Sequence, residues 1–133
     1  MYLSQSYTYI SLYGDKFSPI EFTELVDLKP TDSGIKNEKR KSGATLKECF
    51  WKYQLDKTDA LEELENALES LIGVFKDKVP VMKDFIQKNN LKVKCYVVIE
   101  AKNDEDSGVF LNADFISFLN ELKASIEIDV YNI

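Results

Sequence analysis

Hydrophobic and polar residues alternate along four stretches of the chain, and this alternation predicts half-buried β-strands. In the first stretch, residues 7–13, one face of the predicted strand carries Thr8, Ile10 and Leu12, and the other face carries tyrosines. The further predicted strands are 46–55, 91–101 and 125–131, together with a short strand at 109–111. Their inward-facing residues are expected to be Cys49, Trp51, Tyr53 and Leu55, then Leu91, Val93, Cys95, Val97 and Ile99, and finally Ile126, Ile128 and Val130.

Helical periodicity separates these strands. Ser18, Pro19 and Glu21 have the spacing of a helix N-terminus, with Ser18 as the cap, Pro19 as the first helical residue and Glu21 completing a capping box. This helix is expected to run to about Leu28. Three more helices are expected: one capped by Asp59, one starting near Pro80 and one capped by Asn112. Their apolar residues are Leu61, Leu64, Leu68, Leu71 and Phe75, then Met82, Phe85 and Ile86, and finally Phe115, Phe118, Leu119 and Leu122.

The order of these elements predicts a single α+β domain over residues 1–133. We expect a two-layer sandwich in which a mixed four- to five-stranded sheet is packed by three or four helices. Helical connections permit parallel neighbours, whereas the short 109–111 segment suggests an antiparallel pair with 91–101. A chain of 133 residues is long enough to bury a core without metal or disulfide staples.

Charge and hydropathy narrow the class of partner. The formal net charge is −6, from 17 basic and 23 acidic residues. Such a balance disfavours nucleic-acid binding and suits a basic protein partner. There is no apolar run long enough to predict a membrane span, and the N-terminal residues lack the features of a signal peptide. A cytoplasmic location is therefore the expectation.

The chemistry available for catalysis is sparse. The chain has no histidine, the usual general base near neutral pH and a common metal ligand. It contains no GxSxG, P-loop or Rossmann glycine pattern, and Cys49 and Cys95 are expected to be buried, inert thiols. We expect no cofactor, no metal and no catalytic residue. A faint calcium-loop pattern across Asn103, Glu105, Ser107 and Asp114 is better interpreted as an acidic surface turn.

Two charged segments are candidates for partner binding. The polar stretch 31–45 predicts a long solvated loop that contains the only basic cluster of the sequence. The second segment is an acidic turn within 103–108. The candidate partner-binding residues are Lys36, Glu38, Arg40 and Lys41 in the loop, with Asp104, Glu105 and Asp106 in the turn. For both segments the alternative interpretation is a solvated surface without a binding role.

Aromatic residues form a third candidate group. They could line a pocket or a partner surface, because aromatic side chains are favoured in both. They are equally typical of ordinary strands, and core packing is the favoured interpretation, above all for the tryptophan. The residues are Trp51, Tyr7, Tyr9, Tyr13 and Tyr53.

Several short motifs occur together in one order along the chain. They are Ser18-Pro19-Ile20-Glu21-Phe22-Thr23-Glu24-Leu25, Leu28-Lys29-Pro30-Thr31, Lys36-Asn37-Glu38, Phe50-Trp51, Leu111-Asn112-Ala113-Asp114-Phe115 and Ser125-Ile126-Glu127-Ile128-Asp129-Val130-Tyr131. In this order they resemble a family of small bacterial proteins catalogued as domain of unknown function 4279. The resemblance covers nearly the whole chain and supports the fold, but the family has no established activity and no assigned catalytic residues. Asn37 stands where the family has glycine, so the backbone of that turn is expected to differ.

These observations favour a bacterial, cytoplasmic, non-enzymatic protein-binding domain. One concrete version is an immunity-type protein that neutralises a basic toxin through an acidic surface. The alternative is a small-ligand-binding protein or minor enzyme that uses carboxylate and tyrosine side chains, which requires the aromatic face of the sheet to be open. Nucleic-acid binding through residues 36–41 ranks last, and no membrane partner is expected.

Overall fold

The structure is a computed structural model that describes residues 4–58, 63–102 and 108–132. The strands are β1 (Gln5–Gly14), β2 (Asp32–Gly34), β3 (Cys49–Gln54), β4 (Lys92–Ala101) and β5 (Ser125–Asn132). The helices are α1 (Pro19–Val26), α2 (Leu64–Phe75), α3 (Val79–Lys88) and α4 (Ala113–Glu121), with the 3₁₀ turn η2 (Lys76–Lys78) between α2 and α3. No helix in the described part of the chain is long and apolar enough to cross a membrane.

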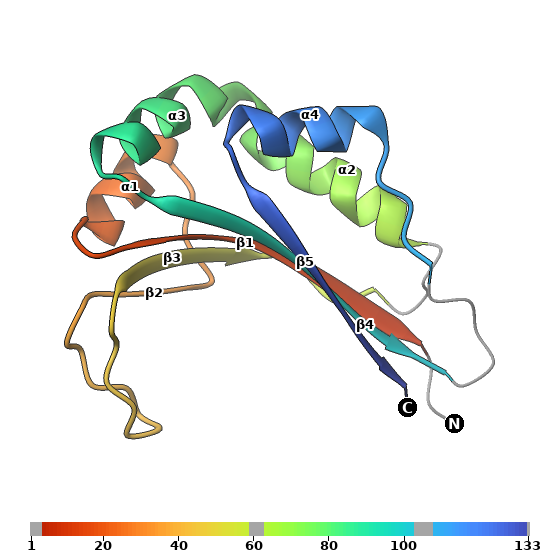
Figure 1. Ribbon diagram of the computed structural model, residues 1–133, viewed down its shortest axis with the longest axis horizontal. Coiled ribbons are helices and arrows are strands. Elements are labelled where there is room, and N and C mark those ends of the chain that lie inside the picture. Colours follow the sequence, from red (N-terminus) through yellow and green to blue (C-terminus); the bar gives the residue numbers. More distant parts are fainter. Residues whose placement is uncertain (1–3, 59–62, 103–107, 133) are drawn as a thin grey trace.

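The five strands form one mixed sheet in the order β2-β3-β1-β4-β5. β1 pairs antiparallel with β3 and with β4, and β2 pairs antiparallel with β3. β5 pairs parallel with β4, and α4 lies between these two strands in the sequence, as a parallel connection requires. All four α-helices lie on one side of the sheet (Figure 1). The predicted α+β two-layer sandwich is confirmed.

The core lies between the sheet and the helices. Trp51 is fully buried, and the ring of Phe22 from α1 meets it edge-on with the ring centroids 4.8 Å apart. The Trp51 indole N–H donates a hydrogen bond to Thr23 Oγ1 at 3.0 Å, which joins β3 to α1. The predicted inward positions of β1 and α2 are buried, among them Ile10, Leu12, Leu64, Leu68, Leu71 and Phe75.

The predicted helix caps are present at α1 and α4. Ser18 Oγ accepts a hydrogen bond from the Glu21 N–H at 3.1 Å, and Pro19 is the first residue of α1. Asn112 Oδ1 accepts from the Phe115 N–H at 2.8 Å. Each side chain satisfies one of the free N–H groups at its helix start. The predicted cap Asp59 and the apolar Leu61 lie outside the described residues.

The prediction of a short strand at 109–111 is wrong. These residues form no strand, and Val109 and Leu111 instead pack their side chains against the core. The position beside β4 that such a strand would take is occupied by β1 on one side and β5 on the other. The antiparallel partner of β4 is therefore β1, and the predicted pairing of 91–101 with 109–111 does not occur.

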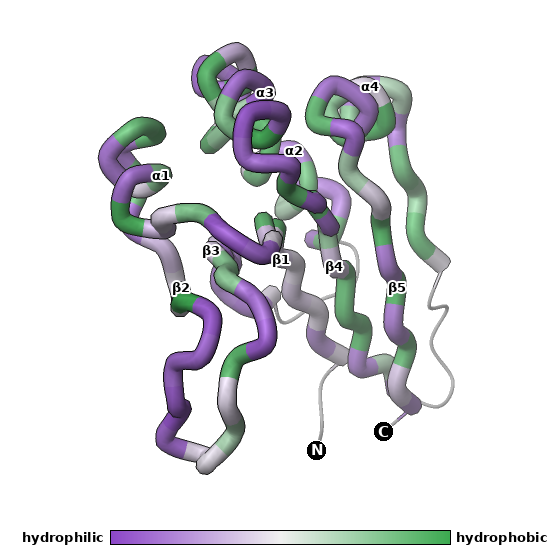
Figure 2. The backbone as a smooth tube through the Cα atoms, turned by 60° about the vertical axis from the view of Figure 1, so that its left-hand side comes forward, coloured by the Kyte–Doolittle hydropathy of each residue, from purple (hydrophilic) through white to green (hydrophobic). Residues whose placement is uncertain are grey.

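The polar stretch 31–45 is also more ordered than predicted. Its first part is β2, and residues 35–48, which we call the β2–β3 arm, fold back on themselves. Asn37 N–H donates to the Leu46 carbonyl at 2.9 Å, and Leu46 N–H donates to the Glu38 carbonyl at 2.9 Å. The arm extends away from the helices, and much of it is hydrophilic (Figure 2). Asn37 lies in a separate turn at residues 35–38, where the Glu38 N–H donates to the Ile35 carbonyl at 3.1 Å. Its φ of 74° is a left-handed conformation that asparagine tolerates better than most residues, so the backbone there is one that glycine also adopts readily.

Two predicted inward positions of β5 are only partly covered. Ile128 and Val130 lie on the helix side of the sheet but are 39% and 44% exposed. β5 is the last strand of the sheet, so side chains on its outer margin have neighbours on one side only.

On α1, Leu25 is 44% exposed, which places it on the outer side of that helix.

Candidate functional site

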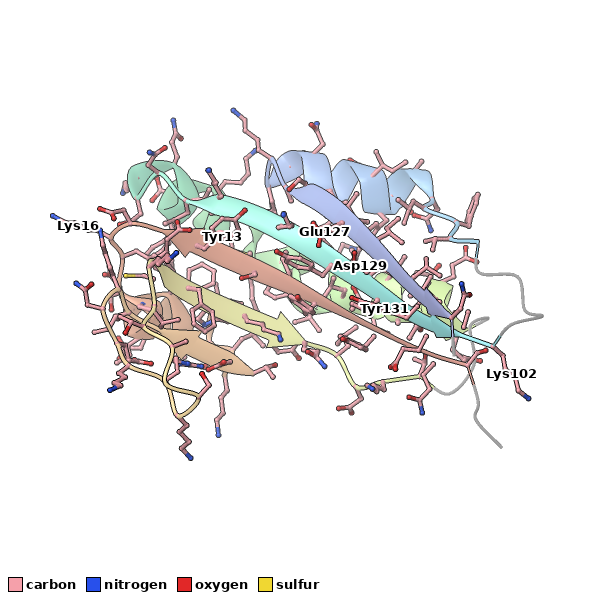
Figure 3. The ribbon with its side chains drawn as sticks, turned by 60° about the horizontal axis from the view of Figure 1, so that its bottom comes forward. Tyr13, Lys16, Lys102, Glu127, Asp129 and Tyr131 are labelled. Atoms are coloured by element: carbon pink, nitrogen blue, oxygen red, sulfur yellow. The ribbon has the colours of Figure 1, made fainter. Side chains whose placement is uncertain are left out.

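No helix of the described residues lies on one side of the sheet, and we call this side the uncovered face. The strand register puts alternate side chains of β1, β3, β4 and β5 there, away from the helical layer. Figure 3 views the sheet from this side. The residues of the uncovered face are Tyr7, Tyr9, Ser11, Tyr13, Phe50, Lys52, Gln54, Lys92, Lys94, Tyr96, Val98, Glu100, Glu127, Asp129 and Tyr131.

Two stacked tyrosines occupy the centre of this face. Tyr9 on β1 is directly opposite Tyr96 on β4, and their rings are stacked with centroids 4.5 Å apart and an interplanar angle of 18°. The Lys52 Nζ lies 4.2 Å from the Tyr9 ring centroid, and the Lys94 Nζ lies 5.3 Å from that of Tyr96. Each ammonium is attracted to the electron-rich face of its ring. The four side chains therefore form one ordered cluster of aromatic rings and cations, which we call the tyrosine–lysine cluster.

The environment of this cluster keeps Tyr9 protonated. Burial raises the pKa of the Tyr9 phenol to about 12, with further contributions from Tyr96 and Tyr7. The pKa of the Lys94 ammonium is also raised, chiefly by Tyr96. At neutral pH the cluster therefore offers a phenol that donates and accepts hydrogen bonds, not a phenolate base or nucleophile.

Carboxylates border the cluster on the β4 and β5 side. Glu127 Oε1 is 3.5 Å from the Lys94 Nζ, and Glu100 Oε1 is 3.1 Å from the Lys57 Nζ. Asp129 stands opposite Val98 in the register and forms no ion pair within the described part of the chain. In Figure 3, Glu127, Asp129 and Tyr131 follow one another along β5 on the uncovered face. Negative charge is thus concentrated at one margin of the face.

The cysteines do not supply a reactive group. Cys49 and Cys95 are both buried and unbridged, as predicted. Burial raises the pKa of the Cys95 thiol to about 11, so little thiolate forms at neutral pH. Within the described ranges, no group of three or more Cys, Asp or Glu side chains could hold a metal ion.

Hollows in the surface lie away from the tyrosine–lysine cluster. One of about 530 Å³ lies between α2 and α4, beside Ile72, Phe118 and Glu121. Another of about 460 Å³ lies between α3 and α4, beside Ile86, Leu91 and Lys123. Both are grooves between helices, on the opposite side of the sheet from the uncovered face.

Three of the four predicted partner-binding residues of the loop, Lys36, Glu38 and Arg40, form ion pairs in the structure. Arg40 binds Asp32 Oδ2 at 2.6 Å and Glu38 Oε2 at 2.7 Å, and it also donates to the Ser33 carbonyl at 3.2 Å. Lys36 pairs with Asp15 at 2.5 Å. The structure therefore brings Glu38 and Arg40 together but places Lys36 in a separate ion pair.

The remaining predicted partner-binding residues are Lys41, Asp104, Glu105 and Asp106. Lys41 is exposed near the turn of the arm. The three acidic residues lie outside the described residues. Their role in partner binding stays a prediction.

Core packing, the favoured interpretation of the aromatic group, is confirmed for Trp51 and for Tyr53, which packs against the core from the helix side. It is wrong for Tyr7, Tyr9 and Tyr13, which share the uncovered face because they alternate with the core positions of β1. Sequence reasoning missed Lys52, Lys94 and Tyr96 as members of a site. Their alternation with core positions was visible in the sequence, but only the pairing of β1 with β3 and β4 places them beside Tyr9.

Comparison with protein-family models identifies the family of this chain. The model of the domain of unknown function 4279 (DUF4279) matches residues 4–133. The chain belongs to the DUF4279 family. No curated protein sequence and no solved structure gives a significant match.

Proposed function

We propose that this protein is a non-enzymatic protein-binding domain and that the uncovered face is its binding surface. The tyrosine–lysine cluster is the observation that supports this proposal. Stacked tyrosines present a large contact area with little side-chain freedom to lose, and tyrosine is enriched at the energetic centres of protein interfaces. The rings and cations of the cluster are already held in place by their contacts with one another.

The shape and chemistry of the face favour a protein over a small molecule. Small-ligand sites are usually concave and enclose most of the ligand. The grooves between helices lie on the other side of the sheet, and the phenol of Tyr9 is held in its protonated form. A broad surface of alternating strand positions instead matches the extended area of a protein interface.

The partner we propose is a basic protein. The net charge of −6 would speed association with a partner of opposite charge, and the carboxylates at the β5 margin give that attraction a location. An immunity-type protein that neutralises a toxin in a bacterial cytoplasm is the concrete version we put forward. Nucleic acids and membranes are not part of the proposal.

Quantitative capture of partners from cells that encode the chain tests this proposal. The bait would be the wild-type protein, Tyr9→Ala on the uncovered face, or Phe110→Ala. Each variant removes one aromatic ring and leaves the net charge unchanged, and Phe110 is 68% exposed in the segment before α4, outside the uncovered face. We expect a protein that binds wild type and Phe110→Ala but is lost with Tyr9→Ala, because the stacked Tyr9 ring lies at the centre of the proposed surface. Capture of the same proteins by all three baits, or of no specific protein, would argue against the proposal.

A small-ligand-binding protein or minor enzyme is the second candidate. It is favoured by one observation, namely that tyrosines and carboxylates share an open face. Thermal-shift screening of the protein against a metabolite library tests it. A ligand whose stabilising effect disappears with Tyr9→Ala but persists with Phe110→Ala would favour this candidate over the first.

A further inference from the structure

β5 forms one margin of the sheet. It pairs with β4 along its inner side, and no strand of the described chain pairs with its outer side. Figure 1 shows it as the last strand beside β4, with α4 above one end only. The outer side of an eight-residue edge strand presents unpaired backbone N–H and C=O groups, which are a template for another strand.

The side chains of β5 alternate strongly in character. Hydrophilic and hydrophobic residues follow one another along the strand in Figure 2. Glu127 and Asp129 are on the uncovered face, while Ile128 and Val130 are on the helix side and are 39% and 44% exposed. A strand added at this edge would therefore meet carboxylates on one of its faces and partly exposed aliphatic side chains on the other.

Charge identifies the occupant and argues against a second copy of this chain. In an antiparallel pair of two β5 strands centred on Ile128, Glu127 would stand opposite Asp129 of the copy. Centring the pair on either carboxylate would place that residue opposite itself. Like charges directly opposite one another destabilise a strand pair. A strand with lysine or arginine at these positions would instead form opposite-charge pairs, and Asp129 is free of any ion pair among the described residues.

We infer that the outer edge of β5 binds an extended basic segment of the partner by strand addition. The added strand alternates apolar residues with lysine or arginine, so that its apolar side chains contact Ile128 and Val130. Its cations contact Glu127 and Asp129. In strand addition the main-chain hydrogen bonds supply affinity and the alternate side chains supply specificity. This inference rests on the proposed function and assigns the chemistry of the partner segment.

A synthetic peptide tests the inference without the natural partner. The probe is an end-blocked peptide of alternating lysine and valine with the eight-residue length of β5, and its control replaces every lysine by glutamate. Binding would be followed by NMR of the isotope-labelled full chain, through chemical shifts and amide hydrogen exchange. We expect saturable binding of the lysine peptide, with the largest shifts and newly slowed exchange at β5 amides. The glutamate peptide should not bind.

Charge variants of the protein separate edge binding from general attraction. Glu127→Lys/Asp129→Lys should weaken binding of the lysine peptide by about tenfold or more. Glu24→Lys/Glu69→Lys changes the net charge equally at exposed positions of α1 and α2 and should leave the affinity nearly unchanged. Asp129→Asn, which keeps the Lys94–Glu127 pair, should weaken binding in the same direction and guards against a folding defect in the double variant.

The inference is overturned if the lysine peptide does not bind, if its shifts map elsewhere, or if both double variants weaken binding equally. A failure of this inference can be distinguished from a failure of the proposed function. A natural partner that is lost with Tyr9→Ala but retained by Glu127→Lys/Asp129→Lys would support the uncovered face and reject the β5 edge.

Discussion

Tyr9 and Tyr96 stand directly opposite each other on β1 and β4, and their rings are stacked with centroids 4.5 Å apart. This contact joins the two longest strands on the side of the sheet that no helix covers. It also removes part of the Tyr9 phenol from water, and that burial is the main reason why its pKa is raised to about 12.

The raised pKa predicts a loss of stability at high pH. The phenol of an unfolded chain ionises near pH 10. Between about pH 10 and pH 12 the unfolded state therefore releases the Tyr9 proton while the folded state retains it, and the free energy of unfolding falls. The contribution is fully present below pH 10. Denaturant unfolding at several pH values should show that the free energy of unfolding falls less between pH 10 and pH 12 for Tyr9→Phe than for wild type. Tyr131→Phe, which removes a tyrosine that is 57% exposed, is the control, and its free energy of unfolding should fall as in wild type. Equal curves for all three proteins would contradict the account.

The hydrogen bond between the Trp51 indole and Thr23 predicts a measurable cost for removing its acceptor. Thr23→Val keeps the shape of the side chain but leaves the buried indole N–H without its 3.0 Å partner. The free energy of unfolding should fall by about 1–3 kcal/mol. Urea unfolding followed through Trp51, the single tryptophan, measures it. The exposed Thr45→Val is the control and should stay within about 0.5 kcal/mol of wild type; a similarly small effect of Thr23→Val would show that the bond contributes little.

Arg40 is predicted to hold the β2–β3 arm in its folded form. Its guanidinium binds Asp32, Glu38 and the Ser33 carbonyl at once, so Arg40→Ala removes all three contacts. Hydrogen exchange at the Asn37 and Leu46 amides, which donate across the arm, should become faster while exchange in β1 is unchanged.

Two further variants refine the test of the arm. Arg40→Lys should restore only part of the protection, because an ammonium lacks the planar fork of arginine. In Lys41→Ala, which changes the exposed neighbouring position, the Asn37 and Leu46 amides should exchange at the same rate as in wild type. Unchanged protection in Arg40→Ala would mean that backbone hydrogen bonds suffice to fold the arm.

The two cysteines are predicted to resist modification in the folded protein. Both are buried, and the Cys95 thiol has a pKa of about 11 and lies 3.8 Å from Thr8 Oγ1. A thiol-reactive probe near neutral pH should label neither residue appreciably until denaturant is added, because the thiolate is the reactive form. Mass spectrometry of the labelled protein distinguishes the two sites. Rapid labelling of either cysteine under native conditions would reveal a reactive thiol.

Local signals in the sequence predicted much of the fold. Ser18 and Asn112 cap their helices as expected, because N-cap chemistry depends on residues only three positions apart. The leucine stripe of α2 and the alternation of β1 and β4 are likewise properties of single segments. The side of each segment that faces the core could therefore be predicted without knowledge of its neighbours.

Features that depend on distant partners could not be predicted in the same way. The pairing of β1 with β4 and the edge position of β5 are set by the whole sheet, so the exposure of Ile128 and the cluster around Tyr9 were missed. The β2–β3 arm is joined to β2 by Arg40, whose partner Asp32 lies on that strand. In the sequence, these charges gave only the pattern of a solvated loop.

Site-specific photo-crosslinking tests the central claim, that the uncovered face binds a protein, most directly. A photoreactive amino acid would replace Gln54, which neighbours Tyr9 in the register, or Ile20, which is 72% exposed on α1. After illumination in cells that encode the chain, we predict a discrete protein adduct from position 54 and none from position 20. The same adduct from both positions, or an adduct from position 20 alone, would contradict the assignment of binding to the uncovered face.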